Sequence, residues 1–309
     1  MSESFNGTVF EERRWSEAER WLLVAVLGLE MVMGVVGNCF VLLVKVMCRG
    51  QFSSRYWLPF INLTLSDLGC SFLIISSSLL AILTSGQRSP WCEVVSLLKF
   101  AFIASSIGSK AILCVQRLIG MASTESAYFV VIVTACLASW VTGTVFGSIP
   151  VVYAWIRYDP AEMLCAVFWE SSYSDMLVYI LCAVSICFFL PFLLIFVCSL
   201  LSATGCRSQG NSDDVADLSA VTPLLVASLM LCYTPFALSE LILLGRMDLS
   251  PAPDWLRTLS SVMSYLDCGL NPLIYCCHQD FREAGLALLW TNRKPQSEPV
   301  LTSITKHDV

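Results

Sequence analysis

Seven long apolar runs, separated by short polar links, constrain this chain more than any other feature of its sequence. They cover residues 21–46, 57–84, 92–121, 127–155, 175–203, 218–244 and 255–277. At a rise of about 1.5 Å per residue, each run is long enough to cross a bilayer core of about 30 Å as a helix. Because the links are short, consecutive helices must pack antiparallel. We therefore expect an all-α membrane protein with a seven-transmembrane helix bundle over residues 21–277.

The amino-acid composition limits the classes of function. Hydrophobic residues make up 56% of the 309 residues and charged residues only 14%, a balance that is foreign to ordinary soluble domains. The net charge of -6 and the lack of a basic tract argue against nucleic acid as a partner. The sequence contains no P-loop and no HExxH, CxxC or GxSxG motif, and its two histidines cannot build a metal site alone. We expect neither an enzyme nor a bound cofactor or metal.

The third run places several polar residues on one helical face. Cys92, Lys99, Ser106, Lys110 and Arg117 recur at spacings that return to nearly the same azimuth at about 100° per residue. A lysine facing the centre of the bilayer costs on the order of 3 kcal/mol, so this face must point into protein or water. Two interpretations stay open for the lysines: internal ion pairs that only stabilise the bundle, or groups that line a functional path.

The segments outside the bundle indicate its orientation. Residues 1–20 are polar and carry a glycosylation sequon at Asn6, as expected of an extracellular tail. The basic residues of the loops are almost equally divided between the two sides of the membrane, so their number does not decide the orientation. With the N-terminus outside, Cys92 and Cys165 are the two cysteines on the oxidising side, where they can form a disulfide.

A short amphipathic helix is predicted after the seventh run. Residues 278–291 include QDFREAGLALLW, which places Phe281, Leu288 and Leu289 on one side and charged residues on the other. Such a helix lies on membrane lipid rather than crossing it. Residues 292–309 are expected to form a cytoplasmic tail.

One landmark stands in each of the seven runs, in a fixed order. The landmarks are Gly37-Asn38, Leu65-Ser66-Asp67, Cys92 with Arg117, Trp140, Pro191, Cys232-Tyr233-Thr234-Pro235 and Asn271-Pro272-Leu273-Ile274-Tyr275. Over essentially its full length the chain resembles the rhodopsin-like (class A) G-protein-coupled receptors. The resemblance implies a plasma-membrane receptor for an unidentified extracellular ligand. Its partners would be a heterotrimeric G protein and, through a phosphorylated tail, arrestin.

The resemblance also implies a ligand pocket near the outer end of the bundle. Lys99 stands where amine receptors of the family carry an aspartate, which disfavours an amine and favours a ligand with an anionic group. Alternatively, Glu240 or Glu30 neutralises Lys99 internally. Tyr233 and Tyr265 are expected to form aromatic walls. Tyr265 also stands where opsins carry the lysine that attaches retinal, so no retinal site is expected.

A second site is expected in the middle of the bundle, where the family binds a sodium ion. Its residues here are Asn38, Asp67, Ser106, Lys110, Asp267 and Asn271. Lys110 replaces an aliphatic residue, and we expect its ammonium to act as a fixed counter-ion for Asp67 and Asp267. The alternative is that Lys110 extends to solvent.

The inner switch departs from the family pattern. The residues expected to form it are Gln116, Arg117, Pro235 and Tyr275. Gln116 replaces the aspartate that usually pairs with the arginine, Ser199 replaces a tyrosine, and residues 204–217 are acidic where a basic loop commonly docks a partner. These departures keep a second class open: a receptor-like binding, decoy or partner protein that does not activate G proteins. A transporter is disfavoured because no internal repeat is evident.

Overall fold

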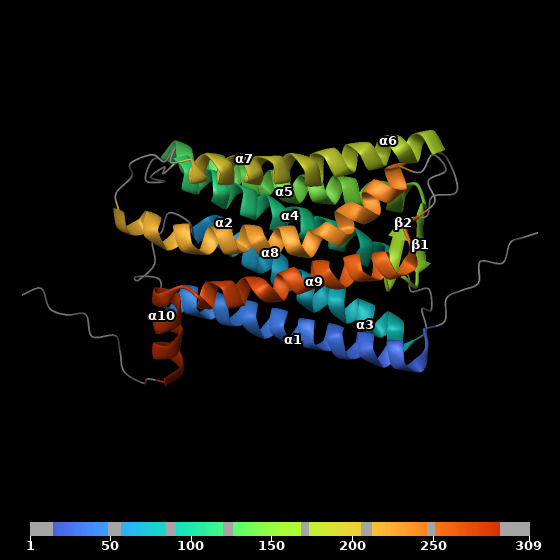
Figure 1. Cartoon of the computed structure of the whole chain (residues 1–309), viewed down its shortest axis with the longest axis horizontal. Helices are drawn as coiled ribbons and strands as arrows, with labels where there is room; N and C mark the ends of the chain where they lie inside the picture. Colours follow the sequence, from blue (N-terminus) through green and yellow to red (C-terminus); the bar gives the residue numbers. More distant parts are fainter. Residues whose placement is uncertain are drawn as a thin grey trace, which may run out of the picture.

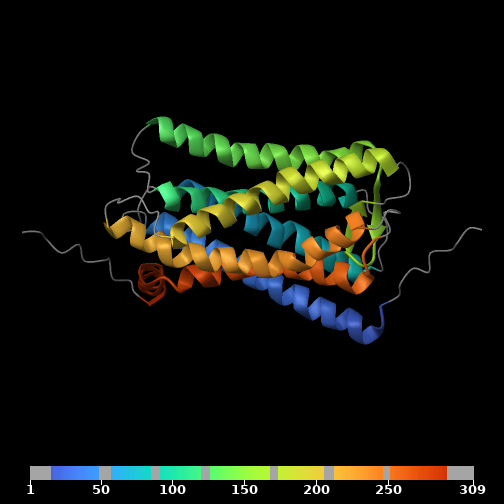
Figure 2. The same cartoon turned by 45° about the horizontal axis from the view of Figure 1, so that its top comes forward.

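The computed structural model describes residues 15–48, 57–84, 91–119, 126–167, 173–204, 212–245 and 251–290. Long helices run side by side along the long axis of the molecule (Figures 1 and 2). The helices are α1 (Glu17–Met47), α2 (Trp57–Gly69), α3 (Ile75–Leu83), α4 (Trp91–Ile119), α5 (Ser126–Val152), α6 (Tyr173–Ala183), α7 (Leu190–Ala203), α8 (Ser212–Gly245), α9 (Asp254–Cys276) and α10 (Gln279–Trp290). The predicted all-α membrane fold is confirmed. Asn6 and residues 292–309 lie outside the described ranges.

Two membrane spans are each built from two α-helices joined by a π-helical turn. The turn η2 (Cys70–Ile74) joins α2 to α3, and η3 (Val184–Phe189) joins α6 to α7. Pro191 is the second residue of α7 and has no backbone N–H, so the preceding turn cannot keep its regular hydrogen bonds. A π-helical turn accommodates this loss without ending the helix.

Six spans in the described part of the chain are both long and apolar enough to cross a membrane, whereas α9 is long enough but too polar. The sequence prediction of seven apolar spans therefore overstates the hydropathy of α9, which has 23 residues. Its polar residues are buried inside the bundle: Ser260, Ser261, Ser264, Asp267 and Asn271. A helix whose polar groups face other helices can cross a membrane with lower overall hydropathy.

Asn38 provides a hydrogen bond to a backbone carbonyl that the proline of α9 leaves without its helical partner. Pro272 has no N–H to donate to the carbonyl of Cys268, one helical turn earlier. The Asn38 side chain donates from Nδ2 to this carbonyl at 3.0 Å and to the Gly34 carbonyl at 2.8 Å. The side-chain amide thus ties α1 to α9 at the kink.

The close contact between α4 and α5 depends on glycines. A Cβ added at Gly143 would lie 2.9 Å from Ala101 Cα and 2.9 Å from Ala104 Cβ, and one at Gly147 would lie 3.0 Å from the Leu97 carbonyl. Small residues four apart let transmembrane helices approach closely. Beside this contact, Asn62 of α2 accepts a hydrogen bond from Trp140 Nε1 at 2.8 Å and donates to Ser109 Oγ at 2.7 Å, which links three spans.

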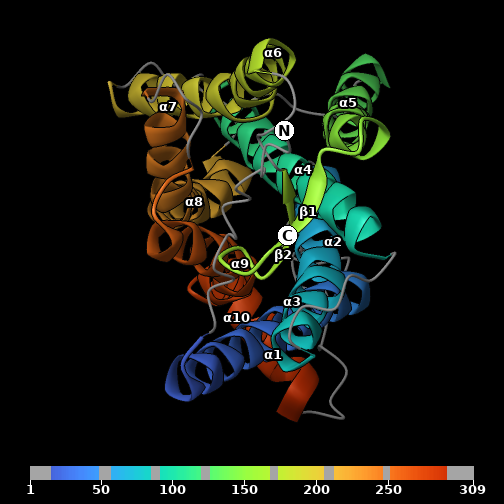
Figure 3. The same cartoon turned by 90° about the vertical axis from the view of Figure 1, so that its right-hand side faces the viewer.

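A β-hairpin covers the end of the bundle at which α1 begins. Strands β1 (Ile156–Asp159) and β2 (Leu164–Val167) pair antiparallel, with Ile156 opposite Val167. The hairpin lies over the centre of the ring of helices (Figure 3). Its turn enters the bundle, and Met163 is fully buried against apolar side chains of α1, α3 and α4. The predicted disulfide is present and joins Cys165 to Cys92 at the start of α4, with 5.5 Å between the Cα atoms.

The helix α10 lies across the bundle axis at the opposite end (Figure 1). Its buried residues are Phe281, Ala284 and Gly285, and the Phe281 ring packs edge-on to Phe40 of α1 at 6.3 Å between centroids. Leu288 and Leu289 continue the spacing i, i+3, i+4, i+7, i+8 from Phe281. Leu289 is 67% exposed, so it does not pack on the bundle as Phe281 does. Contact of α10 with membrane lipid stays a prediction.

Candidate functional site

Two cavities lie beneath the hairpin, and eight residues line both of them. Their volumes are about 170 Å³ and about 60 Å³. Both are lined by four charged residues: Lys99, Glu162, Glu240 and Arg257. Phe188 and Phe236 line both cavities, Tyr179 lines the larger one and Tyr233 the smaller one. The hairpin, α4, η3, α8 and α9 therefore enclose one outer site of mixed charge and aromatic character, which we call the outer cavity.

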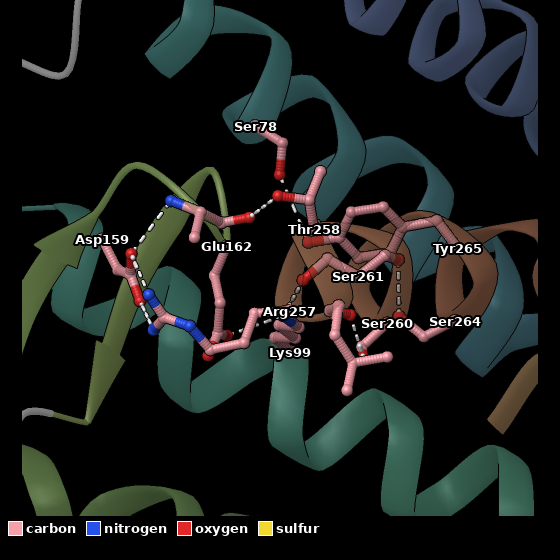
Figure 4. Close-up of polar contacts among 12 residues, drawn as sticks. Ser78, Lys99, Asp159, Glu162, Arg257, Thr258, Ser260, Ser261, Ser264 and Tyr265 are labelled. Carbon is pink, nitrogen blue, oxygen red and sulfur yellow. Dashed lines mark hydrogen bonds and ion pairs between the residues drawn. The ribbon is translucent and has the colours of Figure 1, made fainter. Parts of the chain in front are cut away.

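Lys99 points into the bundle and is neutralised by the hairpin (Figure 4). Its Nζ lies 3.6 Å from Glu162 Oε2, 3.5 Å from Ser261 Oγ and 5.4 Å from the centre of the Tyr265 ring. The expectation that Glu240 or Glu30 neutralises Lys99 is therefore wrong. Sequence reasoning missed Glu162 because it lies on a loop, and helical periodicity says nothing about which span a loop residue reaches.

The two predicted aromatic walls differ in position. Tyr233 lines the smaller cavity as expected. Tyr265 is fully buried, shares a hydrogen bond of 3.3 Å with Ser78 of α3, and lines neither cavity. Tyr265 therefore contacts the Lys99 ammonium with its ring but does not line the outer cavity. The expectation that Tyr265 forms an aromatic wall of the ligand pocket is wrong.

Polar contacts between the hairpin and α9 close the outer cavity (Figure 4). Arg257 donates to the carboxylates of Asp159 and Asp254, the latter at 3.0 Å between Nη2 and Oδ1. Thr258 Oγ1 donates to the Ala161 carbonyl at 2.8 Å. Burial raises the pKa of Asp159 and the neighbouring Glu162 carboxylate adds to the rise, whereas the Arg257 guanidinium opposes it. None of these residues carried a signal in the sequence.

A second polar cluster lies deeper on the same face of α4. Lys110 Nζ contacts the two carboxylate oxygens of Asp267 at 2.7 and 2.6 Å, and Ser228 Oγ of α8 donates to Asp267 Oδ1 at 3.2 Å. The side chains of Lys110 and Asp267 are each only 1% exposed. The alternative that Lys110 extends to solvent is wrong, because its ammonium is held by α9 inside the bundle.

Asp67 lies with its expected neighbours Ser106 and Asn271, but it is not in direct contact with Lys110. Its carboxylate accepts hydrogen bonds from Ser106 Oγ at 2.9 Å and from Asn271 Nδ2 at 2.7 Å. Among the ion pairs of the described residues, the one that Lys110 makes is with Asp267 and not with Asp67. The lysine is thus a direct partner of one carboxylate, and neutral donors hold the other.

The residues expected at the inner switch lie on three helices, α4, α8 and α9. Tyr275 is buried against the rings of Phe60 and Phe281, at 5.1 and 6.3 Å between centroids. Pro235 lies in the middle of α8. Gln116 is 1% exposed, and within the described residues neither nitrogen nor oxygen of its side-chain amide has a hydrogen-bond partner. Arg117 follows it in the last turn of α4.

Known proteins share this architecture. The family model described as "7 transmembrane receptor (rhodopsin family)" matches residues 37–275. Short-wave-sensitive opsin 1 from Mus musculus is 26% identical over 183 residues, which are 52% of this chain and 49% of the opsin. The chain thus spans about half the length of that relative. The crystal structure of squid rhodopsin superposes with a TM-score of 0.70 at 19% identity, over 89% of this chain and 86% of that chain.

Proposed function

Because this chain belongs to the rhodopsin family of seven-transmembrane receptors, we propose that it binds a small extracellular ligand and signals through a heterotrimeric G protein. It is a multi-pass membrane protein, typical of the plasma membrane, and its family consists of receptors and not enzymes. The observation that carries the proposal is the polar face of α4. This face runs from Lys99 at the outer cavity, through the buried Lys110, to Arg117 at the inner end.

The proposed mechanism follows from the helices that meet at both sites. A ligand in the outer cavity touches α4, α8 and α9, and the same three helices meet at Lys110, Ser228 and Asp267. A ligand shifts the equilibrium between two packings only by the difference in its affinity for them. A change in the spacing of α8 and α9 at the outer cavity would therefore act on Arg117 through the Lys110 ion pair.

Two ligand types gain little support. Covalent retinal attachment through a helix-seven lysine is not available, because α9 contains no lysine. A ligand that binds Lys99 through an anionic group must first displace Glu162 from its ammonium. Arrestin recruitment by the tail and contact of α10 with lipid remain part of the proposal.

A second candidate function is that of a receptor-like binding, decoy or partner protein without G-protein activation. It is favoured by Gln116, whose buried amide provides no carboxylate to hold Arg117 in a resting state. Ser199 and the acidic segment 204–217 also favour this candidate.

Restoring the two lost switch residues separates these candidates. If the chain is a receptor, we expect wild type to activate at least one G-protein class above empty vector. Gln116→Asp with Ser199→Tyr should then lower that basal signal, because the new carboxylate holds Arg117. If the chain is a silent partner protein, wild type is inactive and the double variant gains coupling. The measurement is second-messenger output in transfected cells at matched surface expression, with Gln116→Leu as the uncharged control.

A further inference from the structure

The charges around the outer cavity do not balance. Lys99 is paired with Glu162, and Arg257 is paired with Asp159 and Asp254. Glu240 lines both cavities, yet no described lysine, arginine or hydrogen-bond donor contacts its carboxylate. The lining residues and their ion-pair partners thus comprise two cations and four carboxylates. The four charged lining residues balance formally, but Lys99 and Arg257 are already paired, which leaves Glu240 as the lining carboxylate without a counter-ion among the described residues.

A charged carboxylate without a counter-ion is unfavourable in an enclosed site unless it takes up a proton or a ligand cation compensates it. At an effective dielectric constant of about 20, a unit positive charge at about 4 Å gains about 4 kcal/mol from such a carboxylate. A second anion placed there is repelled by a similar amount. The cavity therefore discriminates between ligands by the sign of their charge.

Aromatic rings next to Glu240 also favour a positively charged ligand. Phe188 and Phe236 line both cavities with Glu240, and their rings lie 4.9 Å apart between centroids. Phe100 packs edge-on to Phe188 at 6.0 Å and lines the larger cavity. The faces of aromatic rings attract organic cations, more strongly where water is excluded.

We propose that the outer cavity binds a small organic cation, whose ammonium or guanidinium group pairs with Glu240 beside the rings of Phe188 and Phe236. The inference rests on the proposed ligand-binding function and names the chemical class of the ligand. The volume of about 170 Å³ limits this cation to a small molecule. In the sequence, Lys99 alone disfavoured an amine ligand. In the structure, the charge of Lys99 is already compensated by Glu162.

Charged thiol reagents of opposite sign test this proposal and do not require the natural ligand. Ser239 of α8 lines both cavities, and Ser239→Cys places a reporter thiol there. The thiolate attacks a methanethiosulfonate, forms a mixed disulfide and releases methanesulfinate. The probes are the trimethylammonium-ethyl and sulfonatoethyl reagents, added outside cells, with the modified peptide quantified by mass spectrometry. Wild type gives the background from native cysteines.

The ratio of the two rates is the measured quantity. Glu240 also suppresses ionisation of the thiol, but it does so for both reagents, so this effect cancels in the ratio. The ratio is the rate with the cationic reagent divided by the rate with the anionic reagent. We expect this ratio to be about tenfold or more higher for Ser239→Cys than for a free thiol in solution. In the same background Glu240→Gln should abolish the preference. Glu30→Gln is the matched control and should keep it, because Glu30 is a buried carboxylate of α1 outside the lining.

Three results would overturn the proposal: a preference for the anionic reagent, a cation preference that survives Glu240→Gln, or a thiol that neither reagent reaches. If Ser239→Cys fails to reach the surface, Ser96→Cys on α4 reports on the larger cavity instead. The test is independent of signalling. G-protein activation without a cation preference refutes only this inference, and a cation preference without G-protein activation refutes only the proposed function.

Discussion

Lys110→Met is expected to destabilise the folded protein by about 3–5 kcal/mol, because it leaves a buried carboxylate without its counter-ion. In the wild type the ammonium contacts both oxygens of Asp267, and both side chains are 1% exposed. Removing the ammonium keeps the packing volume but leaves Asp267 with one neutral donor, Ser228. The measurement is thermal unfolding of purified protein in lipid nanodiscs, together with surface expression in cells.

The double variant Lys110→Met with Asp267→Asn is the decisive control. Replacing both partners removes the unpaired charge, so most of the lost stability should return. Lys45→Met serves as a matched lysine control: its ammonium lies over the Phe60 ring at 5.1 Å in the last turn of α1, and its loss should cost less than about 1 kcal/mol. Equal stability of the single and double variants would contradict the assigned ion pair.

The same variants test whether the ion pair biases the switch. If Lys110 only stabilises the bundle, the stable double variant should signal like wild type. If the ion pair couples α4 to α9, the basal signal of the double variant should differ from that of wild type although the stability of the double variant is restored.

Cys165→Ser is expected to cost about 2–5 kcal/mol, because the disulfide to Cys92 fixes the hairpin on α4. The contacts of the hairpin residues Met163 and Glu162 with the bundle, and of Arg257 with Asp159 of the hairpin, depend on that position. The measurement is the unfolding temperature with and without an external reductant. Reduction should lower the unfolding temperature of wild type and leave that of the variant unchanged.

Cys277→Ser provides the control for this experiment, since Cys277 is an exposed free cysteine. It should unfold like wild type and stay sensitive to reductant. A Cys165→Ser variant as stable as wild type would show that the remaining contacts of the hairpin suffice to hold it in place.

The span positions and the inward face of α4 were predictable because membrane physics is local in sequence. The length of an apolar run shows directly whether it can cross a bilayer as a helix. Lysines that recur on one helical face must point away from lipid. The resemblance to the receptor family, and not the apolar pattern, placed Lys110 and Asp267 together inside the bundle. The apolar pattern overstated the hydropathy of α9, because the polar residues of this helix that face other helices lower its mean hydropathy.

The composition of the outer cavity was less predictable because it depends on a loop. The partner of Lys99 is Glu162, which the hairpin turn carries into the bundle. Arg257 and Asp159 meet only because the disulfide and the buried Met163 hold that turn in place. Periodicity describes one helix at a time, so it does not show which loop residue reaches which helix. The same limit hid the unpaired position of Glu240.

We propose that this receptor acts on G proteins through Arg117 at the inner end of α4. The most direct measurement is guanine-nucleotide exchange on purified heterotrimers of each G-protein class, with the protein reconstituted in nanodiscs. We expect wild type to accelerate exchange on at least one class, and Arg117→Ala to return the rate to that of empty nanodiscs. Rates equal to those of empty nanodiscs for every class, or acceleration that Arg117→Ala leaves intact, would contradict this proposal.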